Sequence, residues 1–239
     1  MEDLLCLVSQ AAKQNIDWHG IEDALSSFVV PMSRTEQNPA FHAEGDVWTH
    51  TMMVMDSAAK FKDKAENPLG FMLSALCHDF GKITATKEID GKIHAYGHEV
   101  QGKEIISQFL HRLTNEKELI KYVLNMAEFH MKPNIIAADN SSLKASNKMF
   151  DKSVDPVGLI YLSVSDRHGD NKNEKFLLGR YNIYKEYMSR DYVGGGDLID
   201  MGINPSENFS EILSFAHKMR LCGVEKEAVL KQIKAQWCK

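Results

Sequence analysis

The sequence predicts an all-α protein: a helical bundle with one small β-hairpin insertion and a C-terminal helical extension. Proline is rare, with 6 residues in 239, and the 15 glycines leave long uninterrupted segments. Over most of the chain, apolar residues recur every three or four positions, which is the period of a helix with one buried face. The dipeptide Asp90-Gly91, inside a short alternating stretch, is a strong hairpin signal.

The first 46 residues are expected to contain one helix followed by an irregular segment. A helix is predicted over residues 1–12, because apolar residues fall on one of its faces. Residues 31–46 contain two prolines and Gly45, and are therefore expected to be irregular. Asp46 at the end of this segment is typical of a helix N-cap.

Two helices and the hairpin are predicted next. After Asp46, five residues fall on one helical face: Val47, His50, Val54, Ala58 and Phe61. A densely apolar helix, typical of the centre of a bundle, is predicted from about Leu69 to Phe80 and is ended by Gly81. Residues 84–96 are predicted to form the hairpin. Further helices are predicted over residues 98–113, 115–131, 142–151, 155–169 and 173–190.

A glycine run near residue 195 indicates a hinge between two parts of the chain. The run is Val193-Gly194-Gly195-Gly196, and beyond it the spacing predicts helices over 206–222 and 225–236. We therefore expect a larger domain over residues 1–192 and a helical extension over residues 193–239.

Composition limits the classes of function. The net charge is −5 and the pI about 6.1, which counts against a dedicated tRNA or DNA binder that gains its affinity by neutralising phosphates. Small anionic substrates are compatible with this charge, because a bound cation supplies positive charge locally. Four scattered cysteines without Cys-x-x-Cys spacing are expected to be reduced thiols. Without an 18-residue apolar run or a signal peptide, the expectation is a soluble, cytoplasmic protein with no membrane contact.

The chemistry is expected at the adjacent pair His78-Asp79, at the end of the densely apolar helix. A carboxylate beside an imidazole is costly to bury without a partner. A divalent cation suits both groups. His50 lies on the inward face of the preceding helix, and Asp166 shares a face with Leu159. Two imidazoles and two carboxylates on apolar faces therefore predict a metal site built from three helices.

Each of these residues, taken alone, also has an ordinary structural interpretation. His50 could be a core histidine with satisfied hydrogen bonds, and the His-Asp pair could lie at a helix C-terminus, where the dipole favours a cation. Asp166 could pair with Arg167 or Lys172, and Lys82 could be a surface lysine. The metal interpretation is favoured because all of them occur together in one chain.

Several motifs, taken as a set, resemble those of a known family. They are Gln37-Asn38-Pro39, HAEGDVWTHT over residues 42–51, LCHDFGK over residues 76–82, YGHE over residues 96–99 with Gly102, Glu128-Phe129-His130, SDRHG over residues 165–169, and Asp197-Leu198-Ile199 with GINP over residues 202–205. The set resembles the His-Asp (HD) phosphohydrolase superfamily and, more narrowly, the HD domain of bacterial multifunctional CCA-adding enzymes. The resemblance covers most of the chain.

The resemblance implies one metal site and a phosphate contact. The implied ligands are His50, His78, Asp79 and Asp166, and Lys82 is implied to contact a substrate phosphate. The cofactor is expected to be a divalent ion (Ni, Mn, Fe, Zn, Co or Mg), with one or two ions per chain.

Three further residues are candidates for catalysis. In binuclear relatives, the positions of His98 and His130 bind a second metal bridged by Asp79; in mononuclear relatives they face the scissile phosphate. Either histidine could protonate the leaving oxygen. Arg167 could help to offset charge in the transition state. The remaining histidines at positions 94, 111, 168 and 217 are interpreted as surface or structural residues.

The expected function is hydrolysis of a phosphomonoester or phosphodiester in a nucleotide, or at a 2′,3′-cyclic or terminal phosphate of RNA. The chain is not expected to synthesise CCA ends. About 45 residues precede the first metal motif, and no Gly-Ser followed by an Asp-x-Asp pair occurs. Two alternatives remain open: an RNA-binding or accessory module without catalysis, which the acidic composition opposes, and a di-iron oxygenase.

Overall fold

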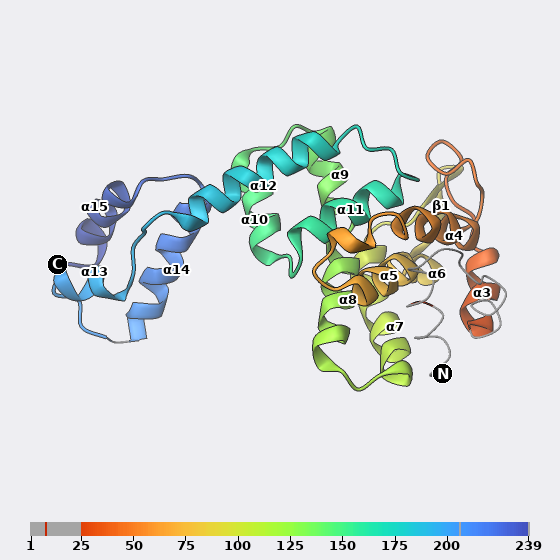
Figure 1. Cartoon of the computed structure of the whole chain (residues 1–239), viewed down its shortest axis with the longest axis horizontal. Coiled ribbons are helices and arrows are strands. Elements are labelled where there is room, and N and C mark those ends of the chain that lie inside the picture. Colours follow the sequence, from red (N-terminus) through yellow and green to blue (C-terminus); the bar gives the residue numbers. More distant parts are fainter. Residues whose placement is uncertain (1–7, 9–24, 206, 239) are drawn as a thin grey trace.

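The computed structural model describes residues 8, 25–205 and 207–238, and it confirms the predicted all-α fold. A larger bundle and a C-terminal group of helices lie at opposite ends of an elongated molecule, and the long helix α12 (Glu174–Ser189) runs between them (Figure 1). The helix predicted over residues 1–12 lies outside the described residues, apart from Val8. Within the described ranges, no helix is long and apolar enough to cross a membrane.

The larger bundle contains most of the predicted helices and the hairpin. The hairpin predicted over residues 84–96 begins later than expected, because residues 84 and 85 belong to a short helix. Before the hairpin lie α3 (Ser26–Ser33), α4 (Val47–Ala58), the 3-10 turn η1 (Lys62–Lys64), α5 (Pro68–Cys77) and α6 (Lys82–Ala85). After it lie α7 (His98–Leu113), α8 (Lys117–Phe129), α9 (Met131–Ala138), α10 (Leu143–Lys152) and α11 (Pro156–Asp166), and then α12.

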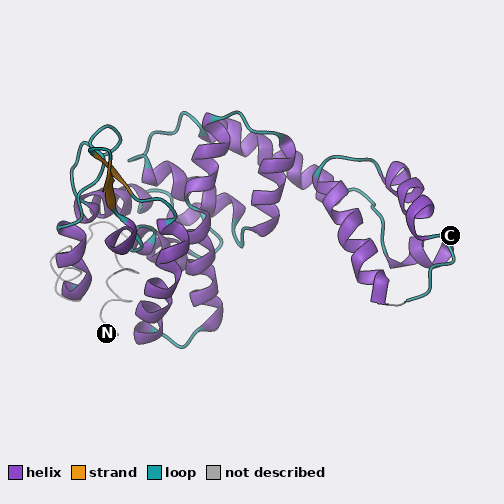
Figure 2. Ribbon diagram, turned by 180° about the vertical axis from the view of Figure 1, so that it is seen from behind, coloured by secondary structure: helices purple, strands orange, loops and turns teal. Residues whose placement is uncertain are grey.

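The hairpin confirms the Asp90-Gly91 turn signal. Strands β1 (Lys87–Ile89) and β2 (Lys92–His94) pair in antiparallel fashion and are joined by these two residues (Figure 2). Their φ angles are +52° and +70°, the left-handed region that a tight two-residue hairpin turn requires.

The start of α4 and the end of α5 position the residues that matter for function. The Asp46 carboxylate accepts the amide hydrogen of Thr49 at 2.9 Å, so the predicted N-cap is confirmed. The prediction that the next helix continues to Phe80 is wrong, because α5 ends at Cys77. His78 and Asp79 therefore lie in a tight turn between α5 and α6, where their side chains can reach other helices.

Proline is tolerated inside two helices that the sequence analysis does not predict. The expectation that the chain is irregular from residue 31 is wrong at its start, because α3 continues through Pro31 to Ser33. The Pro31 carbonyl oxygen accepts a hydrogen bond from the Thr35 hydroxyl at 2.8 Å, which stabilises this helix end. Helix α9 carries Pro133 in its first turn, where the amide hydrogen that proline lacks would have no intrahelical partner.

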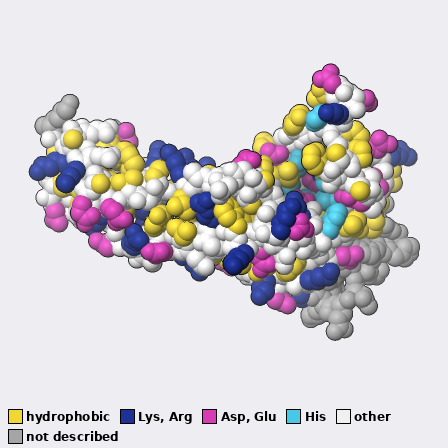
Figure 3. Space-filling view, turned by 90° about the horizontal axis from the view of Figure 1, so that it is seen from above, with side chains coloured by type: hydrophobic (Ala, Val, Ile, Leu, Met, Phe, Trp, Pro, Cys, Tyr) yellow, Lys and Arg dark blue, Asp and Glu magenta, His cyan; other side chains and the backbone are white. Residues whose placement is uncertain are grey.

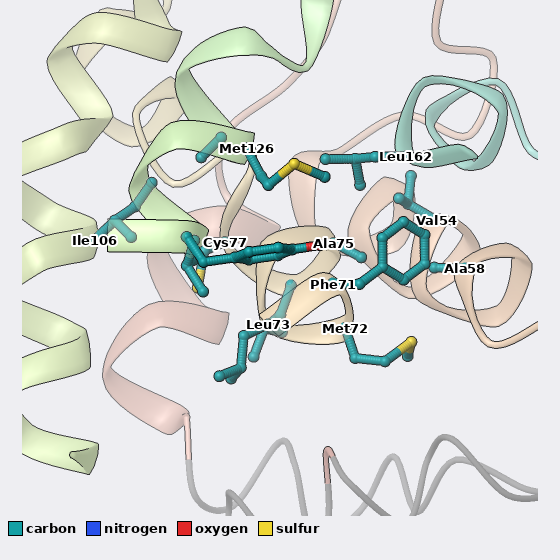
Figure 4. Packing of buried hydrophobic residues seen from close by; sticks show 14 of the residues in the cluster. Val54, Ala58, Phe71, Met72, Leu73, Ala75, Cys77, Ile106, Met126 and Leu162 are labelled. Atoms are coloured by element: carbon teal, nitrogen blue, oxygen red, sulfur yellow. The ribbon is translucent and has the colours of Figure 1, made fainter. Parts of the chain in front are cut away.

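The core of the larger bundle surrounds α5. Helix α5 packs against α4, α8 and α11, and all but its first two residues are buried. Figure 4 shows side chains of α5 packed against Val54 and Ala58 of α4, Met126 of α8 and Leu162 of α11. Because α4, α5 and α11 share this apolar core, the residues at their ends and on their inner faces are brought together.

The C-terminal helices surround a separate apolar cluster. Helices α13 (Gly195–Asp200), α14 (Glu207–Leu221) and α15 (Lys226–Trp237) contribute Leu198, Ile212, Ala216, Val229 and Ile233. The predicted glycine hinge is wrong for its last two residues, which begin α13. The Gly194 amide donates to the Asp197 carboxylate at 2.8 Å and so fixes this helix start. The domain boundary after residue 192 stays a prediction.

Candidate metal centre

Four side chains from three segments converge on one point in the larger bundle. His50 comes from α4, His78 and Asp79 from the turn after α5, and Asp166 from the last residue of α11. His50 Nε2 lies 3.1 Å from Asp166 Oδ1 and 3.7 Å from Asp79 Oδ2. His78 Nε2 lies 3.5 Å and 3.3 Å from the same two oxygens. The structure thus brings together the four residues that the sequence analysis selects as one ligand set.

Hydrogen bonds at the other ring nitrogen orient both imidazoles. The Nδ1 atom of His78 lies 2.8 Å from the carbonyl oxygen of Ala75, which can only accept, so Nδ1 carries a hydrogen there. His50 Nδ1 lies 2.7 Å from a carboxylate oxygen of Glu44. In each ring the Nε2 atom is left facing the cluster, as it is in metal-binding histidines whose outer nitrogen bonds a carbonyl or carboxylate.

The interior of the cluster holds polar atoms without hydrogen-bond partners. Nε2 of His78 and both carboxylate oxygens of Asp79 are buried, and none makes a hydrogen bond of acceptable geometry within the described chain, although the charge of Asp79 is partly offset by the nearby Lys82. Leaving such groups uncompensated in a protein interior is expensive. Imidazole nitrogens and carboxylate oxygens together suit divalent ions such as Zn, Mn, Fe and Ni. The residues present therefore fit a divalent cation.

The charges of the cluster agree with this assignment. Burial opposes the charge on His78, but the carboxylates of Asp79 and Asp166 outweigh it and raise the pKa of His78 to about 10. Burial also opposes the charges of the two carboxylates, yet the neighbouring histidines hold the pKa of both carboxyl groups well below the usual range. Lys82 adds to this effect at Asp79. Both carboxylates are therefore ionised at neutral pH and available as ligands.

A second group of possible ligands shares Asp79 with the first. His98 Nε2 lies 3.1 Å from Asp79 Oδ1, His130 Nε2 lies 3.8 Å from the same oxygen, and the two nitrogens are 3.3 Å apart. Both Nδ1 atoms lie close to backbone carbonyl oxygens, those of Ala95 and Ala127. Burial and the nearby His78 lower the pKa of His130 to about 4, so this ring is neutral and able to bind a metal. The residues thus offer places for one or two ions.

Lys82 lies at the edge of the cluster. Its Nζ atom is 2.6 Å from Asp79 Oδ2 and 2.6 Å from the side-chain oxygen of Gln37. Its predicted contact with a substrate phosphate stays a prediction.

Arg167 has a partner outside the cluster. Its Nη2 atom lies 2.6 Å from Asp170, whose carboxylate is also 3.6 Å from Lys172. Arg167 and Lys172, the two residues considered as surface partners of Asp166, therefore both contact Asp170 instead. No described contact supports the predicted catalytic role of Arg167.

The sequence analysis missed residues that surround His50. Glu44 contacts both His50 and His42, at 2.7 and 2.9 Å. His168, interpreted as a surface or structural residue, places its Nε2 atom 3.2 Å from His50 Nδ1. Gln37 was missed as the partner of Lys82. All of these residues lie inside the motifs that carry the family resemblance, so a signal was present.

A pocket of about 280 Å³ opens onto the centre. Its lining includes Lys82, His98 and Asp166 from the cluster, together with residues of the loop before α4 and the segment after β2. In the space-filling view, histidine side chains are visible in a recess of the larger bundle (Figure 3). A ligand in this pocket would therefore reach the candidate ligands of the metal.

The comparison with family profiles identifies the fold family. Residues 47–168 match the HD domain, and they contain both histidine clusters and Asp166. The chain belongs to the HD domain family. The His-Asp pair after which this family is named corresponds to His78-Asp79, at the centre of the geometry above. HD domains form a superfamily of the metal-dependent phosphohydrolase type and bind divalent metals.

Curated relatives of this HD protein carry the name multifunctional CCA protein. The one from Actinobacillus pleuropneumoniae serotype 5b is 35% identical over 89 residues, which are 37% of this chain and 21% of the relative. The one from Mannheimia succiniciproducens is 36% identical over 94 residues, 38% and 21% of the two chains. The one from Nitrosomonas eutropha is 30% identical over 136 residues, 54% and 31% of the two chains. The matched part of this HD protein thus spans about a fifth to a third of each relative's length.

Proposed function

We propose that this HD protein is a metal-dependent phosphohydrolase that acts on nucleotides or on 2′,3′-cyclic or terminal phosphates of RNA. The observation that carries the proposal is the convergence of buried imidazole nitrogens and carboxylate oxygens from His50, His78, Asp79 and Asp166, next to a pocket that Asp166, Lys82 and His98 line. His50, His78, Asp79 and Asp166 would hold the ion. The relatives' name, multifunctional CCA protein, supports a substrate related to RNA or nucleotides.

In this proposal, different residues of the chain have different roles in hydrolysis. When bound, a divalent cation supplies Lewis-acid chemistry: it lowers the pKa of water and polarises a phosphoryl oxygen. Lys82 lines the pocket beside Asp79 and would contact the phosphate, offsetting the charge that gathers there in the transition state. His98 also lines the pocket, and its Nε2 atom faces Asp79, so it is placed to transfer a proton to the leaving oxygen.

A screen of phosphate esters tests the proposal. Nucleoside 2′-, 3′-, 5′- and 2′,3′-cyclic monophosphates are incubated with the full chain and each of several divalent cations, and the metal content of the purified protein is measured in parallel. We expect hydrolysis of at least one ester that requires the metal. Metal-loaded protein without hydrolysis of any ester would contradict the proposal. Two irons with oxygen-dependent turnover would favour the oxygenase, and salt-dependent RNA binding alone would favour the accessory module.

Two variants connect the activity to the site. Asp79→Ala is expected to abolish metal binding and hydrolysis, because Asp79 contacts both groups of candidate ligands. Lys82→Ala is expected to retain the metal and to lower kcat by roughly 100- to 1000-fold, as the loss of one transition-state contact does. Full activity in Asp79→Ala would show that the site is assigned to the wrong residues.

A further inference from the structure

Two exposed aromatic rings line the pocket above the metal centre. Of the described phenylalanines, tyrosines and tryptophans, only Phe41 and Tyr96 are exposed, with 81% and 72% of their surface accessible. Both line the pocket that contains Lys82, His98 and Asp166. Every other described aromatic side chain is buried or partly buried, so the exposed rings are confined to this one pocket.

Local structure holds both rings close to the metal ligands. Phe41 lies in a turn before α4, where its amide donates to the carbonyl oxygen of Asn38 at 3.0 Å. Tyr96 follows β2 and stacks on His94, with ring centroids 4.8 Å apart and an interplanar angle of 19°. Two residues later, His98 begins α7 and points its Nε2 atom at Asp79. Phe41 thus lies in the loop before α4, which contributes His50, and Tyr96 lies in the segment before α7, which begins at His98.

The chemistry of the pocket favours a planar, uncharged group next to the phosphate site. An exposed aromatic ring presents a π-face on which any of the nucleobases can stack. Among the described residues that line the pocket, Lys82 is the only lysine and there is no arginine. A long polyanion would need several cations along its backbone. A volume of about 280 Å³ is also at the small end for ligand pockets.

We propose that Phe41 and Tyr96 form a nucleobase-binding subsite that places the phosphate of a single nucleotide on the His-Asp cluster. The inference rests on the proposed function, and it narrows the substrate to a phosphate ester whose sugar carries a base. The bound unit is a mononucleotide, and stacking makes the subsite tolerant of base identity.

Kinetics on paired substrates test the subsite. The nucleoside monophosphate that the full chain hydrolyses best is compared with the ribose phosphate of the same linkage, which lacks the base. We expect a preference for the nucleotide in kcat/KM, and we expect Phe41→Ala and Tyr96→Ala each to raise the KM for the nucleotide by roughly tenfold. Phe41→Trp should keep the KM close to that of the unaltered protein, because it retains an aromatic ring at this position.

A matched control separates stacking from the loss of any exposed apolar side chain. Ile199→Ala removes an exposed side chain from α13, outside the pocket, and should leave both substrates unaffected. Equal kcat/KM values for the nucleotide and the ribose phosphate in the unaltered protein would overturn the subsite. So would a KM for the nucleotide that is unchanged in both aromatic variants.

A binding measurement keeps the test separate from catalysis. Saturation-transfer NMR with adenosine, which has no phosphate, reports on the subsite whether or not the protein hydrolyses esters. We expect contact from the adenine protons that weakens in Phe41→Ala and Tyr96→Ala but not in Ile199→Ala. Adenosine binding without hydrolysis of any ester would refute the proposed function alone. Hydrolysis without adenosine binding would refute the subsite alone.

Discussion

The four histidines around Asp79 share one arrangement at the residue scale. In each, Nδ1 contacts an acceptor and Nε2 faces a carboxylate of the cluster. For His78, His98 and His130, the acceptor is the carbonyl oxygen of the residue three positions earlier. This recurring contact at helix ends fixes the ring orientation before any ion binds, which is a property of a preorganised metal site.

Glu44 is expected to strengthen metal binding by orienting His50. Its partly buried carboxylate lies 2.7 Å from His50 Nδ1, and removing a partner of this kind costs about 10- to 100-fold in metal affinity. We therefore expect Glu44→Ala to raise the metal Kd by about this factor, measured by competition with a chelator, and Glu44→Gln to recover part of the loss.

Glu104→Ala is the control for this prediction. The Glu104 carboxylate accepts from Gln108 on the exposed face of α7, away from His50. A metal Kd that is equal in Glu44→Ala and Glu104→Ala would contradict the orienting role. The Co²⁺ absorption spectrum gives a second readout, because a change in ligand orientation alters it even where affinity is retained.

Metal binding is expected to release a proton from His78. Its pKa is raised to about 10 by the adjacent carboxylates, so the ring is protonated at pH 7 in the metal-free protein and must become neutral to bind. The affinity for a divalent ion should therefore rise as pH increases toward about 10. Calorimetry at pH 7 in buffers of different ionisation enthalpy measures the released proton. Binding heats that do not depend on the buffer would contradict the prediction.

The four ligands could be predicted from the sequence because His50 and Asp166 are costly residues on apolar helical faces, and His78-Asp79 is a costly pair at the end of a densely apolar segment. Periodicity did not single out Glu44 and Gln37, because they lie in the irregular segment before α4, where spacing says nothing about side-chain direction. Their only signal was their place inside the motifs that carry the family resemblance. The contact between Glu44 and His50 depends on how that loop folds back over the helix. Sequence spacing alone does not contain this information.

At the scale of elements, Asp155 ties three segments together behind the metal centre. This buried carboxylate caps α11 by accepting from the Gly158 amide at 2.7 Å. It also accepts from the Tyr122 hydroxyl of α8 and from the Glu66 amide before α5. Because α11 carries Asp166 at its other end, this network helps to hold the ligand in place.

Replacing Asp155 is expected to destabilise the whole bundle. Asp155→Ala removes a helix cap and leaves two further buried donors unpaired, which should cost roughly 2–4 kcal/mol of unfolding free energy. Tyr122→Phe removes one hydrogen bond and should cost about 1 kcal/mol. Urea denaturation measures both, with Asp139→Ala at an exposed position as the control. A loss in Asp155→Ala no larger than in Asp139→Ala would contradict the role of the network.

Most helices could be predicted, and three of the misses have a common physical cause. The end of α3 contains Pro31, which was expected to belong to an irregular segment, and α9 contains Pro133 in a stretch for which no helix was predicted; the surrounding bundle accommodates both prolines. The glycines that begin α13 were expected to be a hinge, but Asp197 caps this helix start. In each case a local signal of low helix propensity is outweighed by a specific hydrogen bond or by packing.

At the scale of the whole molecule, two apolar clusters divide the described chain. All residues of the metal centre lie in the larger bundle, and the C-terminal helices contact it through α10, α12 and α14. Asn147 of α10 also donates to the carbonyl oxygen of Leu221 at 3.0 Å. All candidate ligands of the metal therefore come from the larger bundle, and α14 of the C-terminal helices contacts that bundle at α10 and α12.

The predicted domain boundary can be tested with a shortened chain. We expect residues 1–192 to fold and to bind a divalent ion with the affinity of the full chain, because every candidate ligand found in the described part of the chain lies at or before Asp166. Thermal stability should fall, since the contact made by Asn147 is lost. Circular dichroism and metal titration measure the two properties. A fragment that is helical but binds no metal would contradict the independence of the site.

The central claim is that two imidazoles and two carboxylates from α4, α11 and the turn after α5 hold one divalent cation. Anomalous diffraction from crystals of metal-replete protein, at the absorption edge of the bound element, tests this most directly. We expect a peak about 2.0–2.2 Å from Nε2 of His50 and of His78, and from an oxygen of Asp79 and of Asp166. A peak elsewhere, or these four side chains bonded to one another with no ion between them, would contradict it.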